Sequence, residues 1–169
     1  MAQWLEDMEL GNRIELGPWT MDRAEMIAFA QKFDPQPFHI DEAAAARSHF
    51  GGITASGWFT VACWMRAMMH HRQQQAEKYN VLKPESGPGP KPMAGPSPGF
   101  LDMRWPTPVR PGDVIRFSAT ASEKVVMKSR PEWGIIRSVN EGINQNGETV
   151  LHFIGQGMVM RKPPELAGQ

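Results

Sequence analysis

Hydrophobic residues in the first half of the chain recur with the spacing of an α-helix. Between Met26 and Phe33 they occupy positions i, i+3, i+4 and i+7, which lie on one face of a helix. Thr20 precedes this stretch and is a residue type that caps helix N-termini, whereas Pro35 cannot continue a helix. We therefore expect a helix over residues 21–33, with Thr20 as its N-cap and one face in the core.

Two further helices are expected before the middle of the chain. Asp41 can cap a short helix over residues 42–46, which the glycine pair after Phe50 ends. A longer helix should begin at Gly57, because residues 58–69 place apolar side chains on almost every helical face. Such a pattern is typical of a helix surrounded by other structure, so we expect this helix to be central and buried.

In the second half of the chain the hydrophobic period changes to two, the period of β-strands. Apolar, β-branched and aromatic residues alternate over four stretches: residues 100–105, 114–126, 134–144 and 149–160. Pro-Gly and Asn-Gly pairs between some of them are turn signals. With a short strand over residues 13–16, the pattern predicts an α+β fold, in which an antiparallel sheet of about five strands wraps around the central buried helix.

One segment fits neither period. Ten of the sixteen residues from Pro84 to Gly99 are glycine or proline, and six of them are prolines, which lack a backbone donor. This composition predicts an extended, polyproline-like loop. The length of 169 residues agrees with one domain, so we expect a single domain over residues 1–169 with a loop insert at 84–99.

Composition and charge narrow the function classes. The chain has 41% hydrophobic and 21% charged residues, as globular domains do, and 18 basic residues balance 18 acidic ones, which gives no field to attract nucleic acid. The single cysteine, Cys63, cannot form an internal disulfide, and its apolar neighbours indicate a buried side chain. The first residues lack a signal-peptide pattern, and no apolar run is long enough to span a membrane. We expect a cytoplasmic protein that binds neither nucleic acid nor membranes.

The densest polar cluster is Asp-Pro-Gln-Pro-Phe-His-Ile-Asp over residues 34–41, between two predicted helices. Its two prolines restrict the backbone and hold Asp34 and His39 in a fixed relation. A carboxylate and an imidazole close together can position a water molecule and transfer its proton near neutral pH. An aspartate before proline can also simply cap a turn, and a histidine among apolar residues can be an ordinary core residue. The residues alone leave both interpretations open.

Gly57 supplies a second candidate group. The first N–H groups of a helix have no partner within it and carry the positive end of the helix dipole, and a glycine lets a ligand approach the backbone. The Gly57 N–H can therefore stabilise an oxyanion. His70 and His71 look like metal ligands, but adjacent helix residues point apart and no third ligand lies at a suitable spacing. We expect no metal site.

The polar cluster, together with Phe-Gly-Gly-Ile-Thr-Ala-Ser-Gly over residues 50–57, closely resembles the signature of the MaoC-like dehydratases. This family includes the (R)-specific enoyl-CoA hydratases. The shared pattern is Asp34, four residues, His39, and a helix-opening glycine eighteen residues later. Residues 104–113 also resemble a family segment, and the resemblance extends over most of residues 5–162 except the insert.

The resemblance implies a hot-dog fold, in which an antiparallel sheet wraps around the long helix and two units commonly pair edge to edge. A homodimer or a higher homo-oligomer is therefore expected. It also implies that Asp34 and His39 hold and activate a water that adds to C3 of a trans-2-enoyl-CoA, while the Gly57 N–H binds the thioester oxygen. The reverse reaction dehydrates an (R)-3-hydroxyacyl-CoA. No metal or other cofactor is expected, because coenzyme A is part of the substrate.

Two other functions stay open. A hot-dog acyl-CoA thioesterase would use a carboxylate against the same carbonyl, although the pairing of Asp34 with His39 makes it less expected. A non-catalytic acyl-binding subunit is the other, although Asp34, His39 and Gly57 are all intact. Met65 departs from the family, because some (R)-hydratases carry a serine eight residues after the glycine. The basic residues that contact coenzyme A are left unassigned among Arg104, Arg110, Arg116, Arg130 and Arg137.

Overall fold

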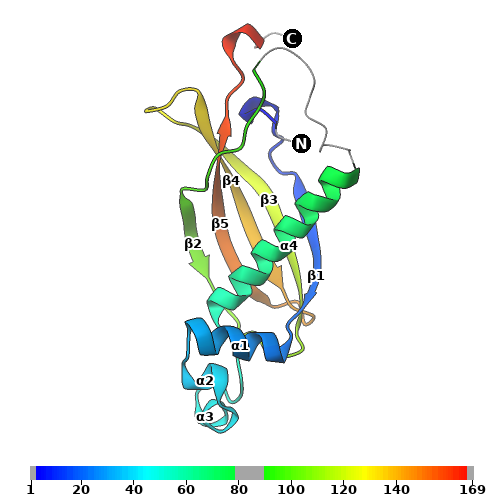
Figure 1. Ribbon diagram of the computed structural model, residues 1–169, viewed down its shortest axis with the longest axis vertical. Helices are drawn as coiled ribbons and strands as arrows, with labels where there is room; N and C mark the ends of the chain where they lie inside the picture. Colours follow the sequence, from blue (N-terminus) through cyan, green and yellow to red (C-terminus); the bar gives the residue numbers. More distant parts are fainter. Residues whose placement is uncertain (1–2, 79–89, 167–169) are drawn as a thin grey trace.

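The computed structural model describes residues 3–78 and 90–166, with the backbone alone at residues 76–78. The described residues form one antiparallel five-stranded sheet in the order β1-β3-β4-β5-β2, and helix α4 runs across one of its faces (Figure 1). The strands are β1 (Arg13–Thr20), β2 (Gly99–Arg104), β3 (Val114–Val126), β4 (Trp133–Ile143) and β5 (Thr149–Met160). The helices are α1 (Arg23–Phe33), α2 (Pro37–Ile40), α3 (Glu42–Arg47) and α4 (Gly57–Lys78), with single 3-10 turns at Leu5–Asp7 and Pro164–Leu166. The α+β arrangement is the expected one.

The strand predictions are confirmed in the second half of the chain. β3 and β5 have the predicted bounds, and β2 and β4 are each displaced by one residue toward the N-terminus. The first strand is longer than expected and continues to Thr20, because a bulge between Glu15 and Pro18 lets it keep pairing with β3. Gly17, with φ of 85°, takes the left-handed conformation that the bulge requires.

The N-cap of the first helix is not Thr20, as expected, but Asp22. Thr20 is the last residue of β1 and pairs with Val114 of β3. Asp22 then accepts a hydrogen bond from the Glu25 N–H at 2.9 Å, which satisfies one of the free donors at the start of α1. The prediction was wrong because sheet pairing extends the strand over the residue that local preference favours as a cap.

Helix α4 packs one face on the sheet. Phe59, Cys63 and Trp64 are buried on this helix, and the Trp64 ring lies edge-on to Phe153 of β5, with 4.7 Å between ring centroids. Phe117 of β3 and Phe153 are both completely buried beneath the helix. Burial of these large apolar side chains is the main force that holds the helix on the sheet.

The opposite face of α4 is not covered by the described residues, which corrects the expectation of a helix surrounded on all sides. Trp58, Met65 and Met69 are 58%, 41% and 43% exposed there. An all-round apolar pattern does not distinguish burial within one chain from burial against a partner subunit. None of the helices in the described part of the chain combines the length and the apolar character that a membrane-spanning segment needs.

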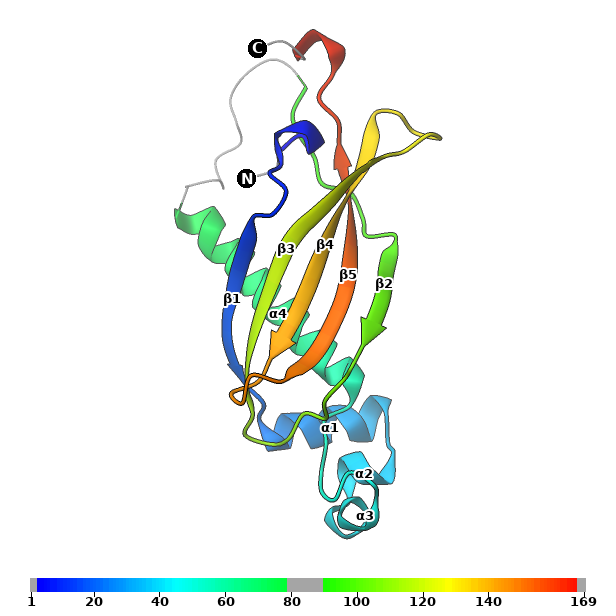
Figure 2. The same ribbon diagram turned by 180° about the vertical axis from the view of Figure 1, so that it is seen from behind.

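Helices α1, α2 and α3 gather at one end of the sheet, where β2 ends and β5 begins (Figures 1 and 2). Residues 90–98 of the insert lie toward the other end (Figure 1). Its residues 84–89 fall outside the described residues, whereas Gly95 donates its N–H to the Met158 carbonyl of β5 at 2.8 Å and Ala94 pairs with Val159. The described part of the insert therefore extends the β2 edge along β5. The single-domain organisation of residues 1–169 stays a prediction.

Candidate active site

Asp34 ends helix α1. Its N–H donates to the Ala30 carbonyl at 2.9 Å, and its backbone angles (φ −151°, ψ 65°) have left the helical region. Pro35 disfavours a helical conformation for the residue before it, which explains the turn at this position. The side-chain amide of Gln36 donates to Asp34 Oδ1 at 2.8 Å. The carboxylate is thus oriented by its own loop.

His39 lies on α2, a four-residue helix in a segment that we had expected to be a connection without helix. Pro37 occupies the first turn of this helix, where its missing N–H has no consequence. The His39 side chain is buried, and the residue is 6% exposed. His39 Nδ1 is 2.7 Å from the Thr54 carbonyl oxygen and 3.3 Å from Thr54 Oγ1. Thr54 therefore determines the orientation of the imidazole.

The side chains of Asp34 and His39 face each other, with 3.5 Å between Oδ2 and Nε2. Because the Thr54 carbonyl can only accept a hydrogen bond, Nδ1 carries the proton that it donates. A neutral His39 then directs an unprotonated Nε2 toward the carboxylate. Two acceptors in this relation can share one water molecule, each accepting one of its hydrogens. The lone pairs of that water oxygen would point away from the pair, as a nucleophile requires.

The surroundings of Asp34 favour its charged form. The pKa of Asp34 lies below its usual value, chiefly because the Gln36 amide donates to the carboxylate. The Ser56 hydroxyl and His39 lower this pKa further, and partial burial opposes them. The Asp34 carboxylate is therefore ionised at neutral pH and available as a hydrogen-bond acceptor.

Gly57 is the first residue of α4, and its N–H has no acceptor among the residues that the structure describes. The Trp105 indole packs against the Cα of Gly57. Its Nε1 donates a hydrogen bond to the Gly57 carbonyl at 3.0 Å. A Cβ atom at Gly57 would lie 2.8 Å from Trp105 Cε2, closer than carbon atoms approach. Glycine is therefore required here by a tryptophan that lies 48 residues away in the sequence.

Asp34, His39 and Gly57, the three site residues predicted from the sequence, line one cavity of about 260 Å³. Its wall comes from the residues after α1, from α2, from the segment before α4 and the start of α4, from the segment after β2 and from β5. The other lining residues are Gln36, Phe38, Phe50, Thr54, Ala55, Trp58, Thr60, Trp105, Thr107, Pro108, Val109 and Val150. Asp34 and His39 are the only ionisable groups in the described wall. The cavity joins one acid–base pair to an apolar, aromatic surface.

Sequence reasoning missed Thr54 and Trp105. Both lie inside the two blocks that resemble the family signature, residues 50–57 and 104–113, which is the signal that could have singled them out. Their contacts could not be inferred from spacing, because each joins segments far apart along the chain. As for metal ions, no group of three or more His, Cys, Asp or Glu side chains is suitably placed within residues 3–78 and 90–166.

Arg110 supports the segment that precedes the site. Its guanidinium donates to the carbonyls of Gly52 at 2.9 Å and Ile53 at 3.2 Å, and also to that of Phe50. Its N–H donates to Asp113 Oδ2 at 2.7 Å. Arg110 is thus committed to holding residues 50–53, which makes it a poor candidate for contact with coenzyme A.

Two of the other four arginines are also engaged. Arg104 donates from Nε and a terminal nitrogen to Asp102 Oδ1, at 2.8 and 2.6 Å, and Arg137 pairs with Glu123 at 2.7 Å. In the described part of the chain, two of the five form no side-chain hydrogen bond or ion pair: Arg116 and Arg130. These two remain the candidates that are free to contact an anion.

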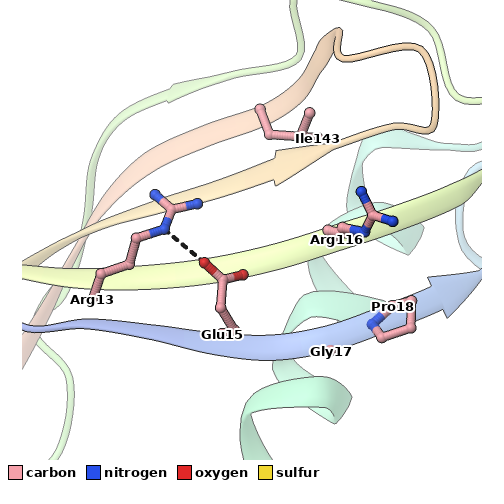
Figure 3. A pocket seen from close by; sticks show the side chains of 6 residues that line it. All are labelled: Arg13, Glu15, Gly17, Pro18, Arg116 and Ile143. Atoms are coloured by element: carbon pink, nitrogen blue, oxygen red, sulfur yellow. Dashed lines mark hydrogen bonds and ion pairs between the residues drawn. The ribbon is translucent and has the colours of Figure 1, made fainter.

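Arg116 borders a second hollow, of about 480 Å³, on the sheet face opposite α4 (Figure 3). Arg13 and Glu15 form an ion pair at 2.7 Å along its rim, and Gly17 leaves its floor without a side chain. Although it is larger than the cavity at Asp34, this hollow contains none of the predicted site residues. Its lining holds two arginines and one glutamate but no carboxylate–imidazole pair, so we do not regard it as the reaction site.

Comparisons with known proteins identify the family of this chain. The sequence model of the MaoC like domain matches residues 7–83. The crystal structure of a MaoC-like dehydratase from Rhodospirillum rubrum is 34% identical, and the alignment covers 95% of this chain and 99% of that one, with a TM-score of 0.72. A monoamine oxidase regulatory protein from Archaeoglobus is 25% identical over 96% of this chain and 97% of its own, with a TM-score of 0.74.

The R-hydratase PhaJ1 from Pseudomonas aeruginosa shares the fold at 21% identity, covering 95% of this chain and 88% of that one, with a TM-score of 0.61. The uncharacterized protein YdeM from Bacillus subtilis is 34% identical over 58 residues, which are 34% of this chain and 41% of that protein. The match therefore covers less than half of the length of this curated relative.

The sheet, the helix across it and these similarities define a hot-dog protein. The chain belongs to the MaoC-like dehydratase family, as the resemblance in its sequence indicated.

Proposed function

We propose that the protein is a hydro-lyase that reversibly hydrates a trans-2-enoyl-CoA, and in reverse dehydrates an (R)-3-hydroxyacyl-CoA. The observation that carries this proposal is the 3.5 Å approach of Asp34 and His39 in the same cavity as the open Gly57 N–H. The family name and the R-hydratase among the structural neighbours support the reaction class.

The first step is activation of water. Asp34 Oδ2 and His39 Nε2 each accept a hydrogen from one water molecule, which leaves its oxygen directed at C3 of the enoyl group. As the oxygen forms its bond to C3, His39 Nε2 accepts the proton that the water loses. The Asp34 carboxylate stabilises the imidazolium that results. The Thr54 carbonyl holds the ring in place throughout.

The second step is stabilisation of the enolate. When the C3–O bond forms, the electron pair of the C2=C3 bond moves toward the thioester, and negative charge develops on the thioester oxygen. The Gly57 N–H, at the positive end of the α4 dipole, donates to that oxygen. The proton held by His39 then returns to C2, so that one water is added and no other reactant is needed. The cavity needs no metal or redox group for this sequence.

The proposed substrate is an acyl-CoA thioester, and the acyl chain would contact the aromatic wall that includes Phe38, Trp58 and Trp105. We further propose that the protein is a homodimer or a higher homo-oligomer and that it works in the cytoplasm. The exposed apolar face of α4 and the exposed apolar residues of β2 support the assembly.

The experiment is an assay of the purified protein with a panel of trans-2-enoyl-CoAs of different chain length. Loss of the enoyl absorbance without release of free thiol is the expected result. Release of thiol from saturated acyl-CoAs would instead identify a thioesterase. Binding of acyl-CoA without either reaction would identify a non-catalytic subunit.

A further inference from the structure

The Ser56 hydroxyl is buried and has no partner at full hydrogen-bond geometry in the described residues, yet it acts on the Asp34 carboxylate and lowers its pKa. Ser56 is 0% exposed, and its Oγ has no partner within hydrogen-bond geometry among the described residues. Buried polar groups nearly always have a partner, because leaving one unsatisfied costs free energy. A completely buried hydroxyl between two residues that line the cavity, Ala55 and Gly57, therefore calls for a partner at the site.

Local structure does not explain this hydroxyl. Serine directly before a helix ordinarily accepts a hydrogen bond from the first turn, as Asp22 and Asp41 do for α1 and α3. Ser56 precedes α4 but its Oγ does not cap that helix. Only its carbonyl is used, which accepts from Thr60 N–H at 3.2 Å and from Thr60 Oγ1 at 3.4 Å.

The backbone around Ser56 is held on both sides. The Ala55 N–H donates to the Val109 carbonyl at 2.9 Å, and Ser56 itself is tied to the first turn of α4 by its carbonyl. Two residues earlier, Thr54 holds His39. With the backbone fixed, only rotation about χ1 and of the O–H bond can reorient the hydroxyl, and the group it acts on is the Asp34 carboxylate, whose pKa it lowers.

We propose that Ser56 is a positioning residue for Asp34: the Ser56 hydroxyl donates a hydrogen bond to the Asp34 carboxylate and holds it for the reaction. This inference rests on the proposed function. Gln36 already donates to Asp34 Oδ1. A second donor holds the carboxylate in one rotamer, in which Oδ2 faces His39 and the water.

The proposal has a consequence for the pH dependence. The group that Ser56 acts on must be ionised, so activity falls as the pH drops through the pKa of Asp34. Of the ionisable groups in the described wall, only His39 faces Asp34, and the first turn of α4 carries no acidic residue. A Ser56→Ala change therefore removes a donor without altering the charges nearby.

The test measures the pKa of the Asp34 carboxyl by carbon-13 NMR titration of the folded protein and, in parallel, the pH profile of kcat/KM. In Ser56→Ala we expect the carboxyl pKa and the acidic limb to rise together by roughly one pH unit, with kcat lowered and KM little changed. Ser118→Ala is the matched control, because Ser118 is equally buried at 1% exposure but lies on β3 outside the cavity.

An unchanged carboxyl pKa in folded Ser56→Ala would overturn the proposal. If this variant does not fold, Ser56→Cys keeps the volume with a weaker donor, and we expect a smaller shift in the same direction. No shift there would also overturn it. The NMR titration needs no turnover, so it separates a failure of this inference from a failure of the hydratase assignment.

Discussion

The indole of Trp105 lies directly over the backbone of Gly57, with its Nε1 donating to the Gly57 carbonyl at 3.0 Å. The contact closes one wall of the cavity next to the N–H that we assign to the thioester oxygen. It also leaves no space for a side chain, because a Cβ at Gly57 would lie 2.8 Å from Trp105 Cε2. The position of the Trp105 ring therefore depends on the absence of a side chain at Gly57.

A Gly57→Ala change should displace Trp105. We expect a loss of about 1–3 kcal/mol in the free energy of unfolding from overpacking, and a loss of roughly 10²-fold in turnover because the cavity wall moves. Thermal unfolding and the hydratase assay measure the two effects. The double variant Gly57→Ala/Trp105→Leu relieves the contact and should recover stability without recovering turnover. Normal stability and turnover in Gly57→Ala would contradict the geometry.

The Asp34–His39 pair makes a separate prediction. Asp34→Asn and His39→Gln should each lower kcat by about 10²–10⁴-fold, because Asn has no charge to stabilise the imidazolium and Gln cannot take up the proton of the water. Circular dichroism should show folded proteins. His39→Ala is a poorer test, since it leaves the buried Thr54 carbonyl without its donor at a cost of about 1–3 kcal/mol. Folded variants with the turnover of the unchanged protein would exclude the catalytic assignment.

The lowered pKa of Asp34 predicts how stability depends on pH. A carboxyl whose pKa is lower in the folded than in the unfolded state contributes stability above its unfolded pKa, and this is lost as the pH falls through the folded value. The Gln36 amide is the main cause of the lowering. The stability difference between the protein and Asp34→Asn should therefore be constant at neutral pH and change only below about pH 4. Urea unfolding at several pH values checks this.

Cys63 should be unreactive in the folded protein. Burial, with Glu25 as a smaller cause, raises the pKa of its thiol to about 12, and the residue is 4% exposed. About one thiol in ten thousand is then ionised at pH 8, and thiolate is the reactive form. We expect an aromatic disulfide reagent to modify Cys63 only after unfolding in guanidinium chloride. Rapid modification of the native protein would show that α4 opens readily.

The sequence predicted the elements whose patterns are long. β3 and β5 were correct to the residue, because alternation over a dozen positions with turn residues at the ends leaves little choice of bounds. The start of α4 at Gly57 was also correct. Helix α2 was missed because four residues cannot show a helical period.

The candidate site was predicted in its residue types but not in its contacts. The spacing of Asp34 and His39 pointed to a pair, yet nothing in it indicated that Thr54 would hold His39 or that Trp105 would cover Gly57. These contacts depend on tertiary packing, which local patterns do not encode. The exposed face of α4 was missed for a related reason, since hydrophobicity does not say which chain will cover it.

The edge of the sheet at β2 is where we expect two copies to pair. An edge strand has unpaired backbone donors and acceptors, and β2 adds Phe100 and Leu101, 40% and 41% exposed. The other edge, β1, is less suited, because Pro18 lacks an N–H to donate to a partner strand. Closing the β2 edges against each other would form one continuous sheet.

Leu101→Lys should therefore weaken the dimer by placing a charge on this edge. Analytical ultracentrifugation is expected to give a dimer or larger assembly for the unchanged protein, and a mass near one chain for the variant at micromolar concentration. Leu10→Lys is the matched control, since Leu10 is 52% exposed but lies outside β2, and it should leave the assembly intact. If the unchanged protein sediments as an active monomer, the exposed apolar residues of β2 and α4 need another explanation, because each copy then works without a partner to cover them.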